Sequence, residues 1–520
     1  MTPRKRLRAP LAILTVTGLA LTAACTSGGA DDGGGEDGGD GDDALSSLSI
    51  MAPYFAAVPP EEDDLIDQAL SELTGVDLSV QWVPNTAYGE RTNVVLAGDD
   101  IPDVMVIQGK TQAFVQTAEA GGFWDLTDYL RSGDYPNLVS ENPDVEEASG
   151  VNGRVFGIYR ARDVIRHCII LRADWLANLG LEQPQTTDEL FEVARAFTED
   201  DPDGNGQDDT YGFINPAWPG SIGSNSPYDA LELWHGAGNL WTDEGGELVP
   251  SFTTDEWMEA VLYERDLVQN GYTNPDYATM DPATWNEPFV NGQGGIIIDV
   301  QSRAPQLVDL FREQDPENFE SYVALVGQPE GPNGTFAMPT SGYSGFLAIP
   351  RSSVETEEQL EQVLTVLNDL TSTEAQILLN NGIEGDNFTV VDDYAEFNPD
   401  RQDFTDQVTG AWAQLGMNVA GYNAYSTRPE TPFDEGLAQL RLDLQAEDLE
   451  NAVFNPGASL VSDTYMSSGT QLDTLISDAR IQFIAGQIDE AGLQDVIDRW
   501  HSQGGDQVIA EMNELYSELG

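Results

Sequence analysis

The fold of this chain is decided by residues 48–83, which read LSIMAPYFAAVPPEEDDLIDQALSELTGVDLSVQWV. The apolar run 48–52 predicts a strand, 61–74 carries apolar residues at helical spacing behind an acidic first turn, and 78–83 predicts another strand. This strand–helix–strand order is typical of a parallel sheet with helices on its faces. The sequence therefore predicts an α/β fold.

The alternation of predicted strands and helices continues after residue 83. Residues 92–97 are helical in pattern, and a turn at 98–103 leads into the apolar strand 104–107. In sheets of this kind, ligands bind beyond the carboxyl ends of the strands. That rule points to three loops, at 53–61, 84–88 and 108–112.

A second lobe is expected to begin near a predicted strand at 167–171. Further strands are predicted at 295–300 and 346–350, and further helices at 187–198, 254–270 and 356–370. The chain should therefore pass between the lobes more than once. We expect one mostly parallel, helix-flanked sheet in each lobe, with 46–165 and 301–385 in lobe 1 and 166–300 and 386–520 in lobe 2.

Size and charge exclude some classes of partner. About 475 residues follow the leader and linker described below, which is too many for one core and suits two lobes. The chain carries 22 Lys and Arg against 90 Asp and Glu, a formal net charge of −68. A chain this acidic would be repelled by nucleic acid and by anionic membrane surfaces. We expect neither as a partner.

Residues 1–24 have the features of a secretory signal peptide. Basic residues at 4–8 precede the apolar run 11–21, which is too short to span a bilayer. The next residues, LTAAC, end at Cys25 and resemble the lipid-attachment motif of bacterial lipoproteins, in which the cysteine is acylated and becomes the first mature residue. Thr22 departs from the commoner leucine or valine. An ordinary signal peptide with a chance cysteine is the alternative interpretation.

Residues 26–44, TSGGADDGGGEDGGDGDDA, have almost no apolar surface to bury. Their like charges repel one another, so we expect 25–45 to be a lipidated cysteine followed by a disordered linker. This linker would hold the folded lobes outside the cell membrane, with the lipid as the only membrane contact.

Motifs of hydrolytic enzymes are missing from the sequence. The chain contains neither His-Glu-x-x-His nor Cys-x-x-Cys, and Gly-Tyr-Ser-Gly at 342–345 has its second glycine one position too early for Gly-x-Ser-x-Gly. His167 and Cys168 lie in an apolar run that predicts a buried strand, so we expect them in the core. The sequence offers no metallohydrolase or serine hydrolase site.

Oxygen-bearing residues alternate through DPDGNGQDDT at 201–210. This spacing is typical of a calcium loop, with Gln207 contributing its backbone carbonyl. The candidate ligands are Asp201, Asp203, Asn205, Gln207 and Asp209. The twelfth position is Gly212 instead of glutamate, so this is not a complete EF-hand, and an acidic surface turn without metal is the alternative. Calcium bound here would stabilise the conformation of the loop.

Motifs from end to end of the chain resemble those of one family, the extracellular solute-binding lipoproteins of bacterial ABC importers. The likeness is to its long oligosaccharide-binding branch, which includes the LplA/YtcQ-type lipoproteins and the alginate-oligosaccharide-binding proteins. The motifs are LTGV at 73–76, LAGDDIPD at 96–103, NGRVFG at 152–157, LRADWL at 171–176, GIEG at 382–385, and Trp500 with GGD at 504–506. The calcium-type loop is similar too, although Thr210 replaces the usual acidic tenth residue.

The resemblance implies a two-lobed, type II periplasmic-binding-protein-like fold that closes on a sugar and presents it to a membrane permease. Such a protein would be a monomer that binds without catalysis. Sugar sites combine flat aromatic rings with amide and guanidinium groups. The candidates are Tyr54, Gln108, Trp234, Trp285, Arg303, Tyr343 and Trp412. The alternative for the aromatic residues is packing in the core, and for Arg303 an ion pair with a nearby carboxylate.

Other functions stay open at this point. The many acidic residues could supply two carboxylates for glycoside hydrolysis. A ligand-sensing lipoprotein could use the same fold, and the ligand could be a peptide or another non-sugar. Chain shortening of oligosaccharides on incubation would separate the hydrolase from the binding protein.

Overall fold

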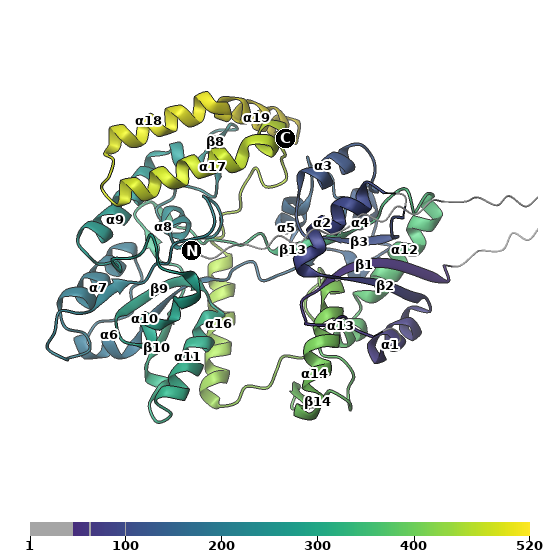
Figure 1. The fold of residues 1–520 in the computed structure, drawn as a ribbon, viewed down its shortest axis with the longest axis horizontal. Coiled ribbons are helices and arrows are strands. Elements are labelled where there is room, and N and C mark those ends of the chain that lie inside the picture. Colours follow the sequence, from purple (N-terminus) through teal and green to yellow (C-terminus); the bar gives the residue numbers. More distant parts are fainter. Residues whose placement is uncertain (1–44, 62–63, 99, 520) are drawn as a thin grey trace, which may run out of the picture. The chain divides into compact units, whose positions relative to one another are not determined.

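The computed structural model describes residues 45–61, 64–98 and 100–519. Two sheets organise this part of the chain (Figure 1). The first sheet has the strand order β2-β1-β3-β13-β4. Its strands are β1 (Ser47–Tyr54), β2 (Asp77–Pro84), β3 (Val104–Ile107), β4 (Ile158–Ala161) and β13 (Tyr343–Ala348).

The first unit of the chain confirms the predicted strand–helix–strand order. β1 pairs in parallel with β2 and β3, and α1 (Leu65–Thr74) connects β1 to β2. The Asp64 side chain caps α1 by accepting from the backbone N–H groups of Ile66 and Asp67, and Gly75 ends the helix at a φ of 71°. Asp64 is thus the local signal that starts the helix four residues after the expected position.

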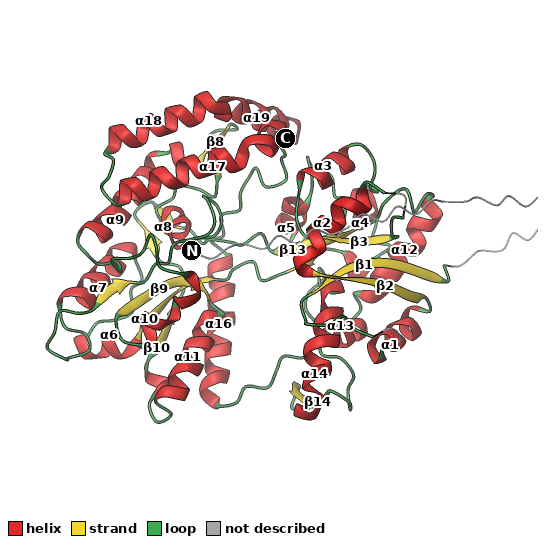
Figure 2. Ribbon diagram, in the orientation of Figure 1, coloured by secondary structure: helices red, strands yellow, loops and turns green. Residues whose placement is uncertain are grey.

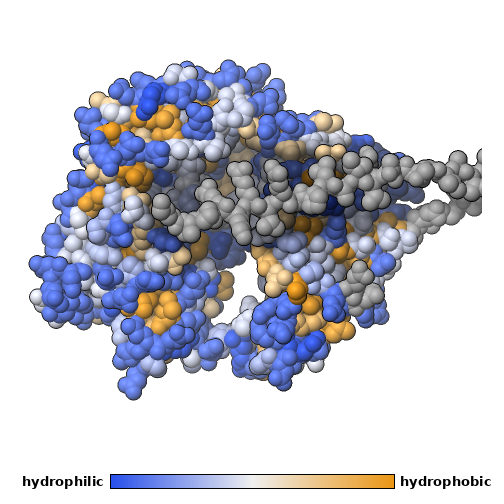
Figure 3. Space-filling view, in the orientation of Figure 1, coloured by the Kyte–Doolittle hydropathy of each residue, from blue (hydrophilic) through white to orange (hydrophobic). Residues whose placement is uncertain are grey.

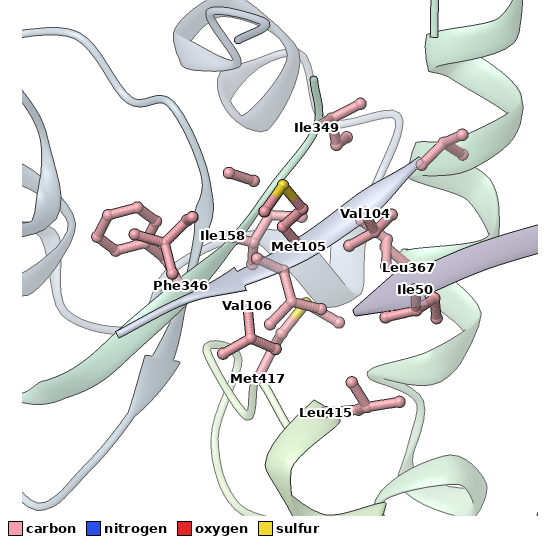
Figure 4. Packing of buried hydrophobic residues seen from close by; sticks show 14 of the residues in the cluster. Ile50, Val104, Met105, Val106, Ile158, Phe346, Ile349, Leu367, Leu415 and Met417 are labelled. Carbon is pink, nitrogen blue, oxygen red and sulfur yellow. The ribbon is translucent and has the colours of Figure 1, made fainter. Parts of the chain in front are cut away.

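The first core lies between this sheet and the helices around it. Figure 4 shows side chains from β1, β3, β4, β13 and α12 (Glu357–Leu370) meeting Leu415 and Met417, which lie far from the first strands in sequence. The other helices that contribute to this core are α2 (Asn85–Leu96), α3 (Gln112–Glu119), α4 (Thr127–Arg131), α5 (Pro143–Ser149), α13 (Thr373–Asn380), α14 (Gln402–Phe404) and α15 (Gly410–Trp412).

The second sheet has the strand order β10-β5-β9-β6. Its strands are β5 (His167–Arg172), β6 (Tyr211–Phe213), β9 (Gly294–Val300) and β10 (Val323–Val326). Successive side chains of β5 point to opposite faces, so Ile169 and Leu171 pack with Trp175 while Cys168 and Ile170 pack with Leu307. Cys168 is fully buried, as expected for a core residue.

Helices cover both faces of the second sheet, and a further helical layer follows (Figure 2). They are α6 (Ala173–Leu179), α7 (Thr187–Glu199), α8 (Pro227–Trp234), α9 (Asp255–Gln269), α10 (Asn286–Val290), α11 (Arg303–Gln314), α16 (Pro432–Leu449), α17 (Asp463–Ile484), α18 (Glu490–Trp500) and α19 (Asp506–Leu519). Three short two-stranded sheets complete the fold: β7 (Trp241–Asp243) with β8 (Leu248–Pro250), β11 (Glu330–Gly331) with β12 (Gly334–Thr335), and β14 (Phe388–Val391) with β15 (Tyr394–Phe397).

The two-lobed α/β fold is confirmed, but the sheets are mixed and not mostly parallel. β13 is antiparallel to β3 and β4, and β5 is antiparallel to both β9 and β10. The reason is topological. β5 and β13 each enter their sheet from the other lobe and so lack the local helical crossover that makes neighbouring strands parallel.

The sheets also divide the chain differently from the expected lobe boundaries. The range 301–385 was expected in lobe 1, yet β10 pairs with β5 of the second sheet. The range 386–520 was expected in lobe 2, yet Trp412, Leu415 and Met417 pack in the first core. Direct crossover segments without a strong sequence pattern, such as 162–166 and 327–342, explain why the boundaries were misplaced.

The visible surface is predominantly hydrophilic (Figure 3), as the net charge of −68 requires. Among the described residues, none of the helices combines the length and the apolar character that a bilayer span needs. The predicted signal peptide, Cys25 and the linker up to residue 44 lie outside the described residues.

Candidate functional site

Two neighbouring cavities lie where the strands of the first sheet end. The first, of about 430 Å³, is lined by Phe55, Gln108, Arg160, Arg162, Ser344 and Gln414. The second, of about 400 Å³, is lined by Ala161, Arg162, Asp163, Arg166, Asn380, Ala413, Gln414, Asn418 and Tyr422. Because they share Arg162 and Gln414, we treat them as one site and call the residues of both cavities the arginine groove.

The sheet places these residues at one edge. Phe55 follows β1 and Gln108 follows β3, so both lie at carboxyl ends of parallel strands, as the ligand-loop rule predicts. β13 is antiparallel to β3 and to β4, so Arg160 near the end of β4 and Ser344 near the start of β13 lie at that same edge. Arg162 and Arg166 then lie on the crossover to the second sheet.

Arg160 is the buried member of the groove, only 3% exposed. Its Nη1 donates to the Ser344 carbonyl oxygen over 2.9 Å and its Nη2 to Gln414 Oε1 over 2.6 Å, while its Nε has no partner. Burial and, secondarily, the nearby Arg162 charge lower the pKa of Arg160 to about 10. Arg160 is therefore a cation held by neutral oxygens.

Arg162 and Arg166 add two further cations. Arg162 Nη1 donates to the neighbouring Ala161 carbonyl oxygen over 2.7 Å. Partial burial, and then the Arg166 charge, lower the pKa of Arg162, while the Asp163 carboxylate opposes this effect. Within the described part of the chain, no ion pair involves Arg160, Arg162 or Arg166.

Exposed aromatic rings accompany the arginines. Phe55 is 62% exposed and Tyr422 59% exposed, which is unusual for large apolar side chains. Gln108 is also exposed, and its Nε2 donates to Asn85 Oδ1 over 2.7 Å. The groove thus combines ring faces, amides and guanidinium groups.

A third cavity, of about 470 Å³, lies on other elements. Its polar lining includes Lys110, Asn225, Asn239 and Tyr343. Lys110 Nζ donates to the carbonyl oxygens of Ala148 and Gly150 over 2.6 and 3.1 Å and also to that of Ala458. Burial lowers the pKa of Lys110 to about 8. Through its hydrogen bond to Ala458, Lys110 links the loop after β3 to the segment between α16 and α17.

Two of the seven predicted ligand residues line cavities. Gln108 lies in the arginine groove and Tyr343 in the third cavity. Tyr343 is partly buried, its hydroxyl donates to the Ala148 carbonyl oxygen over 3.4 Å, and burial raises its pKa to about 12. Their roles in ligand binding stay predictions.

The structure corrects the prediction for the three tryptophans, because each indole is buried in a core. Trp234, Trp285 and Trp412 are 0%, 2% and 2% exposed. Their Nε1 atoms donate to Gln328 Oε1, the Ile214 carbonyl oxygen and Asp64 Oδ2 over 2.9, 2.8 and 2.8 Å. With the N–H groups satisfied internally and the rings packed, no face is left for a sugar.

Arg303 and Tyr54 are corrected for similar reasons. Arg303 forms an ion pair with Asp299 and lies over the Trp285 ring at 4.1 Å from its centroid, so the local pairing considered as the alternative is the one observed. Tyr54 is 9% exposed, and the next residue, Phe55, lines the cavity instead. Adjacent positions of an extended chain point in opposite directions, which explains the one-residue error.

Sequence reasoning missed the arginines of the groove, although a signal was available. Three arginines lie within the seven residues 160–166 of a chain that has few cations. That spacing alone could not show that they lack carboxylate partners, because this depends on the tertiary structure.

The predicted calcium loop brings its oxygen donors together in part. Asn205 Nδ2 donates to Asp203 Oδ2 and Asp209 Oδ1 over 2.8 and 3.2 Å, and Asp201 Oδ2 accepts from the Gly206 backbone N–H over 3.0 Å. Asp201 Oδ1 is buried without a partner. The described residues contain no group of three or more His, Cys, Asp or Glu placed to hold a metal. The donors fit the oxygen chemistry of calcium, with Asn205 at their centre.

The two sheets, the crossovers and the groove at the strand ends define a two-lobed binding protein. The chain matches the bacterial extracellular solute-binding proteins over residues 57–377 and belongs to that family. It is 42% identical to lipoprotein LipO of Bacillus subtilis over 90% of this chain and 92% of that protein.

A second relative and a solved structure agree with this assignment. The polygalacturonan/rhamnogalacturonan-binding protein YtcQ of Bacillus subtilis is 31% identical over 92% of this chain and 93% of its own. An extracellular solute-binding protein from Bifidobacterium longum subsp. infantis has the same fold, with a TM-score of 0.68, 18% identity, and coverage of 92% of this chain and 99% of that chain.

Proposed function

We propose that this protein captures an oligosaccharide in the arginine groove and delivers it to the permease of an ABC transporter. The observation that carries the proposal is the composition of the groove at the strand ends, where exposed Phe55 and Tyr422 accompany the amides of Gln108 and Gln414. Aromatic faces bind the apolar faces of sugar rings, and amides bind their hydroxyls. The name of the relative YtcQ, a polysaccharide-binding protein, supports a carbohydrate ligand.

The mechanism follows from the connections between the lobes. The first sheet and part of the groove belong to one lobe, and the crossover 162–166 leads to the other. A ligand that contacts both lobes gains those contacts only when they close, so binding shifts the equilibrium from open to closed. The permease would then recognise the closed, loaded form of a monomer.

A thermal-shift screen with neutral and acidic oligosaccharides tests this function. A ligand at 100 times its Kd stabilises the folded state by about 2.7 kcal/mol, so a true ligand raises Tm. Chromatography of the same mixtures should recover each oligosaccharide at its original length. Failure of every carbohydrate to raise Tm would contradict the proposal, and chain shortening would favour a glycoside hydrolase.

We also propose that Cys25 carries the lipid that holds the protein on the outer face of the cell membrane. The support is the LTAAC sequence and the 42% identity to a protein named as a lipoprotein. Cys25→Ser should release the protein into the medium, whereas the unaltered protein should sediment with membranes. Equal sedimentation of both would contradict lipid attachment at this residue.

Calcium is proposed as a structural ion of the 201–209 loop. Asp201, Asp203, Asn205 and Asp209 would supply side-chain oxygens and Gln207 its carbonyl. Bound calcium would neutralise the carboxylates and fix the loop between α7 and β6.

A further inference from the structure

A fourth cavity, of about 220 Å³, lies among α17, α18, α19 and the β7–β8 hairpin (Figure 1). We call it the apolar pocket. Its apolar walls include the side chains of Trp241, Phe252, Leu460, Trp500, Val508 and Met512. All six belong to one buried hydrophobic cluster or pack against it. The apolar pocket is therefore a space within a core, unlike the polar arginine groove.

The polar side chains of the apolar pocket already have partners within the protein. They are Lys110, Asn455, Ser462, Tyr465 and Asp473. Ser462 Oγ donates to a carboxylate oxygen of Glu511. The Tyr465 hydroxyl donates to Asp473 Oδ2 over 2.7 Å, and burial raises the pKa of Asp473 to about 6. Lys110 donates to three carbonyl oxygens, and Asn455 Oδ1 accepts from a backbone N–H. Few polar groups are therefore left for the hydroxyls of a sugar ring.

An unfilled cavity with apolar walls is unfavourable. Side chains that line a void lose van der Waals contacts on one side. A cavity of about 150 Å³ with aliphatic and aromatic walls stays dry and binds benzene. At about 220 Å³, the apolar pocket has room for a group of that size. An apolar group that enters it would leave water and restore the missing contacts.

The apolar pocket adjoins the third cavity. The two share four lining residues, which are Lys110, Leu240, Asn455 and Ala458. The third cavity is also close to the arginine groove in sequence, because Tyr343 precedes Ser344 and Lys110 follows Gln108 by two positions. A sugar bound at this edge of the first sheet would thus have the apolar pocket beside it.

The predicted linker has no side chain suited to fill the apolar pocket. Residues 26–44 are Gly, Ala, Ser, Thr, Asp and Glu only. The apolar run 11–21 belongs to the predicted signal peptide, which would be removed from the mature protein. We therefore look for the occupant among the ligands of the protein.

We infer that the apolar pocket binds an apolar substituent, of about the size of one aromatic ring, carried by the sugar ligand. This inference rests on the proposed function and narrows its ligand class to aryl-substituted or acylated oligosaccharides. An aryl aglycone and an ester-linked aromatic acid share this chemistry, and the probes below distinguish the two. An unsubstituted oligosaccharide is the competing ligand, because it would leave the apolar pocket empty.

Saturation-transfer NMR with phenol tests the pocket without any sugar. Phenol supplies one aromatic ring, and glycerol, which supplies hydroxyls alone, is the control probe. We expect saturable phenol binding in the millimolar range and no saturable binding of glycerol.

Variants then assign phenol binding to the apolar pocket. Ile222 and Met466 line it and are only partly buried, so a larger side chain at either position can fill the pocket without displacing a fully buried residue. Ile222→Trp and Met466→Trp should each weaken phenol binding more than tenfold. Val94→Trp is the matched control, because Val94 lies on α2 and is 61% exposed. This variant should leave phenol affinity unchanged.

A second titration links the apolar pocket to the sugar. The oligosaccharide that raises Tm most in the thermal-shift screen is prepared as its methyl glycoside, its phenyl glycoside and an O-benzoyl ester. We expect at least one of the two aryl derivatives to bind more than tenfold tighter than the methyl glycoside, because its ring leaves water. Ile222→Trp and Met466→Trp should abolish this gain.

The outcomes separate this inference from the proposed function. Absence of saturable phenol binding, or equal phenol affinity in the pocket variants and the unaltered protein, would overturn the apolar pocket as a site. Equal affinity for the methyl glycoside and both aryl derivatives would overturn its link to the sugar ligand. Phenol binding by a protein that binds no oligosaccharide would contradict the proposed function and leave the apolar pocket as a site for a free aromatic molecule.

Discussion

Buried and exposed aromatic residues have different roles in this protein. Trp285 is enclosed in the second core and donates to the Ile214 carbonyl oxygen, whereas Phe55 projects into the groove. We expect Trp285→Ala to lower the free energy of unfolding by about 3–5 kcal/mol, the usual loss for a large aromatic core residue. Phe55→Ala should change it by less than about 0.5 kcal/mol and weaken sugar binding instead. Urea unfolding and calorimetry of both variants measure this difference, and a destabilised Phe55→Ala with normal binding would contradict it.

A buried acidic cluster makes stability depend on pH. Arg480 Nη1 donates to Asp229 and Glu232 over 2.8 Å each, but both carboxyl oxygens of neighbouring Glu264 lack hydrogen-bond partners. Burial, and then the charge of Glu232, raise the pKa of Glu264 well above its usual value, and burial raises the pKa of Glu232 to about 7. The folded state therefore holds protons that the unfolded state releases above about pH 4.5.

The sign of the effect follows from this proton uptake. As pH rises from about 4.5 through the raised folded-state pKa values, the unfolded state is stabilised relative to the folded state. The free energy of unfolding therefore decreases. Glu264→Gln removes one of these titrating carboxyl groups. The variant should therefore be more stable than the unaltered protein at pH 8 by more than about 1 kcal/mol, with little difference near pH 4.5. Thermal unfolding of both proteins across this range is the measurement. A variant that is less stable at pH 8 would show that the ionised carboxylate has a partner.

At the level of secondary structure, sequence patterns predicted the strong elements well. The helices expected at 187–198 and 356–370 are α7 and α12, with ends shifted by a residue, because their apolar faces are regular. The helix expected at 92–97 is the end of the longer α2, whose first turn buries a single large side chain, Tyr88, and so shows no repeating apolar pattern. Strand direction could not be predicted, because β5 and β13 enter from the other lobe.

The calcium loop is an element whose stability should depend on its ligand. Calcium added to the chelated protein should raise Tm, because it binds only where the loop is folded. Asp209→Asn should remove most of this rise, since Asp209 contacts the central Asn205. Asp208→Asn is the matched control, with the same charge change at the adjacent position. A calcium titration that releases or absorbs no heat would contradict a site at this loop. So would an equal loss of the calcium-dependent rise in Tm in both variants.

At the scale of the whole molecule, the lobes were predictable but their boundaries were not. The α/β pattern and the chain length indicated two lobes, whereas the assignment of β10 and of 412–419 depends on long-range pairing and packing. The same limit applies to the ligand site. Gln108 follows a strand end and was predictable, but whether Arg160, Arg162 and Arg166 form ion pairs is decided only when distant segments come together.

The central claim, that two lobes close on a carbohydrate, is tested most directly by small-angle X-ray scattering of the protein titrated with its tightest-binding oligosaccharide. The account predicts that the radius of gyration falls as the site saturates and that Arg162→Gln shifts this change to higher ligand concentration. A scattering profile that stays constant while calorimetry shows full saturation would contradict it.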